Sequence, residues 1–285
     1  MDTLYKIERT LHLKPNNDYN SKDLYPNFQE KILEFQELLA KNIQEKIPTT
    51  FYKFGDGDYY FLKKKAIGSA KPGSRALSKP YFLINHSKFL ERSALNDYYT
   101  TLLPKMHTQM FFEIFNKSFD FPTEIVYGLL ANKWLLNNFN EIGLIGADKK
   151  LELVDKLLDF DEYKEYLGIP EFTDYISIPQ KYACDNLSKT LKNVEKQLVN
   201  SKSKLFLVGV GHVKSGLLSE LKKIKNAVFL DIGVGIDALA GIVNIKRPYF
   251  GLWNNFQIKN DSIYKDLDIL INDSSGSHGQ VRFLN

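Results

Sequence analysis

Hydrophobic and polar positions along the chain change their spacing several times. In the first patterned segment apolar residues recur every three or four positions, which predicts a helix; these residues are Phe28, Ile32, Phe35, Leu39, Ile43 and Ile47. Asn27 and Glu30 resemble a capping box at the start of this helix. The apolar run at 50–54 predicts a short strand, and residues 59–66 predict a second helix.

From residue 123 onward, amphipathic and apolar segments alternate regularly. The amphipathic segments predict helices near 123–138 and at 149–159, 187–198 and 215–224. The apolar segments predict strands at 142–145, 175–178, 205–210 and 227–232. This alternation is typical of a parallel sheet covered on both faces. We therefore expect an α/β fold with a Rossmann-like, doubly wound, mostly parallel sheet.

Three other segments lack this regularity. Residues 1–25 are polar and turn-rich, and are expected to be an N-terminal lead-in. Residues 68–90 are rich in Gly, Ser, Pro and Lys, which predicts a long loop. Residues 93–122 are rich in aromatic side chains without a clear period, and we expect them to be helical. Residues 26–285 are expected to form a single domain that ends in an irregular extension at about 245–285.

Composition narrows the function classes. The net charge of +4 is too small for a general nucleic-acid-binding protein. Cys184 is the single cysteine, so an intrachain disulfide and a cysteine-based zinc site are excluded. No uncharged apolar run approaches the roughly 20 residues that span a bilayer, and a soluble, cytoplasmic protein is expected. The many aromatic side chains at 93–122 favour core packing or a homodimer interface.

Polar residues gather where the predicted strands end, and an open parallel sheet binds its ligands beyond those ends. The clearest case is the segment Gly55-Asp56-Gly57-Asp58, which follows the first strand. Two carboxylates separated by one glycine can approach a hard cation such as Mg²⁺ or Mn²⁺. The glycines Gly55 and Gly57 let the backbone turn tightly around a ligand. The alternative interpretation is a solvated Asp-Gly turn.

Basic residues surround this acidic pair. Residues 53–90 contain eight basic and two acidic side chains, a local balance of +6. Such an excess of cations beside two carboxylates suits a pyrophosphate bridged by a metal ion. Arg75 is the best phosphate-binding candidate, whereas Lys63, Lys64 and Lys65 are also consistent with the solvated face of a helix.

A second strand end carries glycines and a histidine. Gly209 and Gly211 follow an apolar strand and open a helix, whose N-terminal N–H groups favour an anion. His212 is a candidate for phosphate contact or for acid–base catalysis, and equally for a structural histidine.

Two further candidates come later in the chain. Asp237 is a candidate base or a helix cap, whereas the nearby Asp231 is expected to fix the geometry of its loop. His278 lies in a terminal segment that apolar residues could anchor over the cleft.

Taken together, these motifs resemble the GT-D-type glycosyltransferase family. The run from Phe54 to Asp58 is similar to the FGDGE motif of that family, and residues 144–147 and 207–233 are similar to its later strand ends. The resemblance implies a Rossmann-like fold that binds a divalent cation and the diphosphate of a sugar nucleotide. Asp56 would match the aspartate of the motif and Asp58 its glutamate. Lys53 stands where an arginine is common, and Val234 stands where a histidine is usual.

Our first hypothesis is therefore a glycosyltransferase that depends on Mn²⁺ or Mg²⁺. It would move a sugar from a nucleotide-diphosphate donor, with a UDP-sugar favoured, to a glycan or glycoconjugate acceptor. Asp237, His212 and His278 are the candidates for the base. The alternatives are a nucleotide- or S-adenosylmethionine-dependent enzyme such as a methyltransferase, and a non-catalytic scaffold with the same fold.

Overall fold

A seven-stranded parallel sheet forms the centre of the protein in its computed structural model, in the order β3-β2-β1-β7-β6-β4-β5. The structure describes residues 27–64, 83–245, 249–251, 253–267 and 281–285. The strands of this sheet are β1 (Thr49–Phe54), β2 (Tyr98–Thr101), β3 (Phe121–Pro122), β4 (Ile142–Ala147), β5 (Asp174–Ile178), β6 (Leu205–Gly209) and β7 (Val228–Asp231). The predicted Rossmann-like, doubly wound α/β fold is confirmed.

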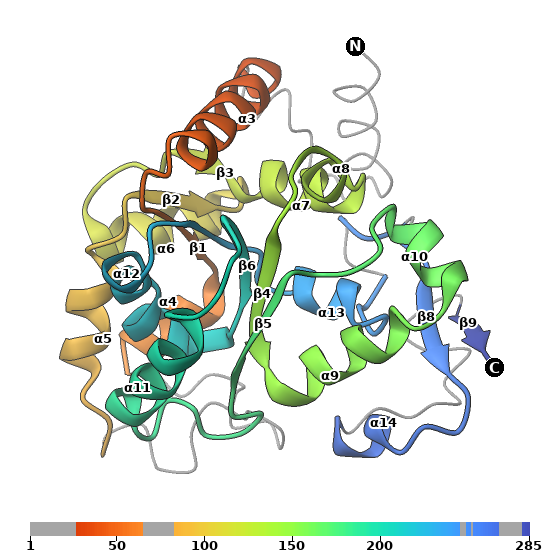
Figure 1. Ribbon diagram of the computed structural model, residues 1–285. Helices are drawn as coiled ribbons and strands as arrows, with labels where there is room; N and C mark the ends of the chain where they lie inside the picture. Colours follow the sequence, from red (N-terminus) through yellow and green to blue (C-terminus); the bar gives the residue numbers. More distant parts are fainter. Residues whose placement is uncertain (1–26, 65–82, 246–248, 252, 268–280) are drawn as a thin grey trace.

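Helices cover both faces of the sheet (Figure 1). One face packs against α4 (Asp56–Leu62), α5 (His86–Ser93), α6 (Lys105–Phe115), α11 (Leu187–Leu198) and α12 (Lys214–Ile224). The other face packs against α3 (Phe28–Gln44), α7 (Thr123–Ala131), α8 (Trp134–Asn138), α9 (Asp148–Leu157), α10 (Asp161–Leu167) and α13 (Gly235–Leu239). Each face buries its own apolar cluster, which is why the strands β4, β6 and β7 are almost continuously hydrophobic.

The two neighbouring strands β1 and β7 lead to opposite faces of the sheet. The helix that follows β1 is α4, whose side chains join one apolar cluster, and the helix that follows β7 is α13, whose side chains join the other. Adjacent strands that diverge in this way open a crevice at their carboxyl ends, where open α/β sheets bind ligands. The acidic motif after β1 is therefore located at the crevice of the fold.

Several sequence predictions need correction near the N-terminal half. The helix predicted at 59–66 begins at Asp56, so the acidic motif forms the first turn of α4 instead of preceding it. Asn27 is the N-cap of α3 but makes no side-chain capping bond, so the predicted capping box is absent. The segment at 93–122 is only partly helical, because β2 and β3 flank α6. Most of its aromatic rings pack in the core on both sides of β2, with Phe112 exposed, and this packing on two faces hid the short strands from a periodicity argument.

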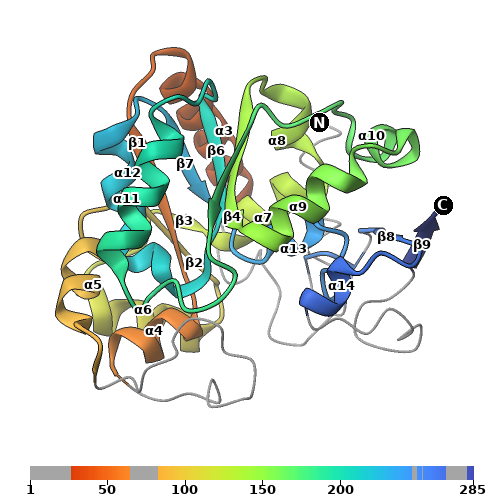
Figure 2. The same cartoon turned by 60° about the horizontal axis from the view of Figure 1, so that its bottom comes forward.

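The C-terminal segment is also more regular than predicted. Strands β8 (Asn255–Ile258) and β9 (Val281–Leu284) pair in parallel, and the short helix α14 (Ile263–Asp266) follows β8. Both views place this small sheet beyond α9 and α10, away from α4 and α5 (Figures 1 and 2). Two predicted site residues, Arg75 and His278, lie outside the described residues. No helix in the described part of the chain is both long enough and apolar enough to cross a membrane.

Candidate functional site

A buried lysine joins the carboxyl ends of β1, β6 and β7. Lys214 is the first residue of α12, and its Nζ lies 3.0 Å from Oδ2 of Asp58 and 2.8 Å from Oδ2 of Asp231. The same ammonium donates a hydrogen bond to the carbonyl of Lys53. All three charged side chains are buried. The one cation lies between the two carboxylates and stabilises the negative charge of both away from water.

Both carboxylates of this cluster also fix the backbone. Asp58 accepts a hydrogen bond from the Gly55 N–H at 2.9 Å, and Asp231 accepts from the N–H groups of Lys53 and Gly233 at 3.2 and 2.9 Å. Burial alone would raise the pKa of Asp58, but Lys214, His212 and Lys53 outweigh it and lower that pKa to about 2. Asp231 therefore fixes loop geometry, in agreement with the sequence expectation, and Asp58 has the same kind of role at the neighbouring turn.

Asp56 differs from Asp58 in its exposure. It is the first residue of α4, its side chain is exposed, and its Oδ1 accepts a hydrogen bond from the Gly57 N–H at 2.8 Å. An anionic side chain at the start of a helix is stabilised by the helix dipole. Of the two predicted acidic ligands, Asp56 is thus exposed to solvent, whereas Asp58 is buried and holds the turn that carries Asp56.

His212 lies directly over the acidic turn. Its ring stacks on Phe61 with 5.1 Å between centroids and an interplanar angle of 6°, and its Nδ1 is 3.9 Å from Oδ1 of Asp58. A Cβ added at Gly57 would be only 3.0 Å from Cε1 of His212. Gly57 is therefore needed for the close approach of the imidazole, so two motifs far apart in the sequence form one site.

Lys53 adds a second cation at the same edge. Its backbone is held by the cluster, whereas its partly buried side chain extends toward α7, with Nζ 5.7 Å from the ring centroid of Tyr127. A Cβ built on Gly55 would be 3.3 Å from this Nζ. No carboxylate in the described part of the chain forms an ion pair with Lys53 within 4.0 Å. Its charge is therefore available to an anionic ligand.

The remaining predicted residues have packing or conformational roles. A Cβ at Gly209 would be 2.5 Å from Cβ of Ile236, so this glycine lets β6 approach the turn after β7. Gly211 has φ +59, which favours glycine, and its Cα faces open space. Asp237 lies in the first turn of α13 and pairs with Lys150 at 2.5 Å, and it is not the N-cap. This ion pair ties α13 to α9, and it occupies the carboxylate that was predicted as a base.

The donor set fits a divalent cation at one carboxylate and not at two. Oδ2 of Asp58 already accepts from Gly55 and contacts the Lys214 ammonium, so a second cation there would meet a buried positive charge. Asp56 retains an exposed carboxylate, and Mg²⁺ typically takes one or two protein carboxylates together with phosphates and waters. Among the described residues no group of three or more His, Cys, Asp and Glu side chains is arranged to hold a metal ion.

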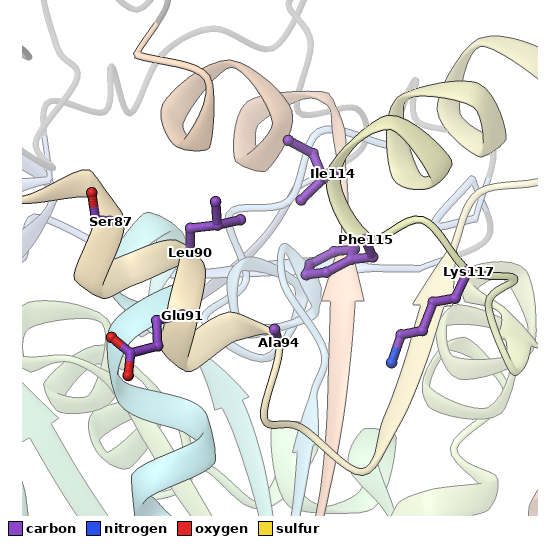
Figure 3. Close-up of a pocket in the computed structure, with 7 residues that line it drawn as sticks. All are labelled: Ser87, Leu90, Glu91, Ala94, Ile114, Phe115 and Lys117. Carbon is purple, nitrogen blue, oxygen red and sulfur yellow. The ribbon is translucent and has the colours of Figure 1, made fainter.

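Among the described residues, two open pockets lie elsewhere on the surface. The larger, about 620 Å³, lies between α5 and α6 and is lined by Leu90, Ile114 and Phe115 with Glu91 and Lys117 at its walls (Figure 3). The smaller, about 390 Å³, lies beside the ends of β4 and β5. Neither is lined by a residue of the Lys214 cluster. The chemistry at the β1–β7 crevice, and not pocket size, selects the candidate site.

Sequence reasoning missed Lys214, the residue that organises the site. A signal was present, because Lys214 opens a helix, where the helix dipole disfavours a cation, and it follows the glycine-rich turn that ends in His212. A lysine at that position suggests that acidic partners compensate its charge. No model of a protein family, no curated protein and no solved structure matches the chain. The geometry of this site is therefore the basis of the functional proposal.

Proposed function

We propose that the protein is a glycosyltransferase that uses a nucleotide-diphosphate sugar as donor and a glycan or glycoconjugate as acceptor. One observation carries this proposal. The buried cluster of Lys214, Asp58 and Asp231 holds the β1–α4 turn so that Lys53 lies beside Gly55 and His212 beside Gly57, the two residues that flank Asp56. A carboxylate beside two basic side chains suits the diphosphate of such a donor.

Asp56 would hold a divalent cation, Mn²⁺ or Mg²⁺, together with oxygens of the diphosphate. When bound, such a cation offsets the negative charge that builds on the departing nucleoside diphosphate. Lys53 supports the same charge through its unpaired ammonium. Asp58 acts through the backbone, because its carboxylate orients Gly55 and Lys214 and does not reach the ligand.

Of the two predicted base residues that the structure describes, His212 is the better placed. Its ring is only partly buried and is oriented by stacking on Phe61 and by the Asp58 carboxylate nearby. A base must hold its orientation relative to the acceptor hydroxyl, and both contacts restrict rotation of the imidazole. Asp237 is less suited to this role, because its carboxylate pairs with Lys150.

The test is a titration of the full chain with UDP-, GDP-, CMP- and dTDP-sugars, with and without Mn²⁺, by calorimetry. We expect one nucleotide class to bind and Mn²⁺ to strengthen its binding at least tenfold. Asp56→Asn should abolish the effect of Mn²⁺. Asp58→Asn should also lower stability, because it weakens the buried pair with Lys214.

Asp148→Asn is the matched control. Asp148 is also the first residue of a helix after a strand, and its Oδ1 accepts from the next N–H at 2.7 Å, as that of Asp56 does. This variant should bind as the parent does. If no nucleotide sugar binds, or if Asp56→Asn and Asp148→Asn bind equally well with Mn²⁺, the proposal is wrong. If a nucleotide sugar binds as expected, the reaction itself is tested next. Turnover of this donor with a pool of glycan acceptors, absent in His212→Ala, would establish the reaction.

A further inference from the structure

Two side chains with buried, unpartnered polar atoms lie at the ends of β2 and β3, beside the site but outside the functions assigned so far; Glu124 is buried as a whole and His107 only in part. His107 is in the first turn of α6, which follows β2, and Glu124 is in the first turn of α7, which follows β3. Strands β1, β2 and β3 are neighbours and parallel, so their carboxyl ends share one edge with the acidic turn. Both side chains therefore lie along the same rim as Asp56.

Glu124 has one satisfied and one unsatisfied oxygen. Its Oε1 accepts a hydrogen bond from the Leu103 N–H at 2.9 Å, whereas Oε2 is buried and has no partner in the described part of the chain. The residue is only 1% exposed. A buried polar atom without a partner is costly, so its presence requires an explanation such as an ordered water or a ligand.

His107 presents the same feature from the neighbouring helix. Its Nδ1 is buried and has no hydrogen-bond partner among the described residues. Burial lowers the pKa of His107, while the charge of Asp56 raises it and that of Lys53 lowers it further. Leu103, whose N–H binds Glu124, precedes His107 by four residues, so His107 follows directly on the segment that Glu124 contacts.

Lys53 connects these two side chains with the candidate site. Its backbone belongs to the Lys214 cluster, and its ammonium lies near Tyr127, one helical turn after Glu124 on α7. The charge of Lys53 also acts on the Glu124 carboxyl. A ligand at the rim could therefore contact Lys53 and both unsatisfied side chains at once.

The chemistry of these groups restricts the ligand. An ionised phosphate has no hydrogen-bond donor for the orphan oxygen of Glu124 and would be repelled by this carboxyl when it is ionised, and an apolar group would leave both orphan atoms without partners. A metal ion would meet the ammonium of Lys53 beside a single carboxylate. Hydroxyl groups both donate and accept, so they satisfy a carboxyl oxygen and an imidazole nitrogen together. Several hydroxyl groups on one rigid ring are the defining feature of a saccharide.

We propose that Glu124, His107 and Lys53 form a saccharide subsite that binds sugar hydroxyl groups next to the diphosphate position. The subsite depends on the proposed function in one respect, the source of the sugar. If the protein is a glycosyltransferase, the sugar is either the transferred sugar of the donor or part of the acceptor glycan. Buried polar groups that are left unpaired by the wrong ligand reject it strongly, so this subsite would select the sugar.

The direct test is saturation-transfer NMR of the full chain with free glucose, galactose, mannose and N-acetylglucosamine. We expect transfer to at least one sugar, its loss in His107→Leu and at least a fivefold weaker affinity in Glu124→Gln. Glu124→Gln keeps an acceptor for Leu103 and the shape of the side chain, so it should fold. Glu91→Gln, an exposed change on α5, should behave as the parent does.

Comparison of UDP-sugar and UDP binding distinguishes the two sources. For the transferred sugar, Glu124→Gln weakens UDP-sugar at least fivefold and leaves UDP unchanged. For the acceptor, both nucleotides bind as before and the free sugar binds in the presence of UDP. Sugar binding that depends on Glu124 without nucleotide binding would retain the subsite and refute the glycosyltransferase. Sugar and nucleotide-sugar binding that is absent from the parent, or identical in parent and both variants, would overturn the subsite.

Discussion

Asp58 and Glu124 are two buried acids on one edge of the same sheet, and their surroundings act on them in opposite directions. Asp58 lies against the Lys214 ammonium and the Gly55 N–H, and its pKa is lowered to about 2 although burial opposes this. Glu124 is equally buried, but the N–H groups of Leu103 and of Glu124 itself and the charge of Lys53 compensate burial only in part, so its pKa is raised to about 7. Burial is common to both, and the partners decide the charge.

This comparison distinguishes a region that stabilises the fold, around Asp58, from a region that can bind a ligand, around Glu124. Around Asp58 the donors and acceptors are matched, which makes the β1–α4 turn rigid and places Asp56 and His212. Around Glu124 hydrogen-bonding capacity is left over, at Oε2 and at Nδ1 of His107. Unused capacity in an otherwise packed interior is what a binding site requires, whereas a fully matched cluster contributes to the fold.

The largest effect on stability is expected when the buried lysine that distinguishes Asp58 from Glu124 is removed. Lys214→Met leaves Asp58 and Asp231 uncompensated, and we expect the free energy of unfolding to fall by about 3–5 kcal/mol. Urea denaturation measures the loss. Lys222→Met is the control on the same helix, because Lys222 forms a more exposed pair with Asp97 at 2.5 Å, which is worth less than about 1 kcal/mol. Equal losses in both variants would show that Lys214 has no special structural role.

The next largest effect concerns Glu124 and pH. Because its pKa is raised, the Glu124 carboxyl keeps its proton to a higher pH in the folded state than in the unfolded state, where its pKa is near 4.5. The stability associated with this proton is complete below pH 4.5 and is lost as the pH rises through about 7. The full difference corresponds to roughly 3 kcal/mol. Glu124→Gln cannot lose a proton, so from pH 5 to pH 8 it should gain roughly 2–3 kcal/mol over the parent in urea unfolding. A constant difference would contradict the shifted pKa.

The smallest effect on stability is expected at Gly57, which joins the two motifs of the site. Gly57→Ala raises helix propensity by about 1 kcal/mol but places a Cβ against His212, so the net change should stay within about 1 kcal/mol. Binding of the nucleotide sugar should nevertheless weaken severalfold, because the imidazole is displaced. In a His212→Ala background the same change should have no further effect on binding. An undiminished effect there would assign Gly57 a role independent of His212.

The sequence was sufficient for the parallel sheet and for the strand end that carries the acidic motif. It was sufficient because hydrophobic residues are spaced differently in strands β4 to β7 and in the helices between them, so the two kinds of element can be told apart. It was insufficient for the short strands β2 and β3, whose aromatic residues pack on both faces. It also could not assign separate roles to Asp56 and Asp58, since the partner of Asp58 comes from α12, far along the chain. Glu124 left a weak signal as one acid within the apolar segment that follows Pro122.

The position of β1 between β2 and β7 has a consequence for synthesis on the ribosome. The N-terminal strands β1 to β3 can assemble early, but the second edge of β1 stays unpaired until β7 is translated near the end of the domain. At ordinary elongation rates this interval is on the order of ten seconds. An open hydrophobic strand edge is a template for wrong pairing during that time. Slow translation before β7 should therefore lower the yield of folded protein.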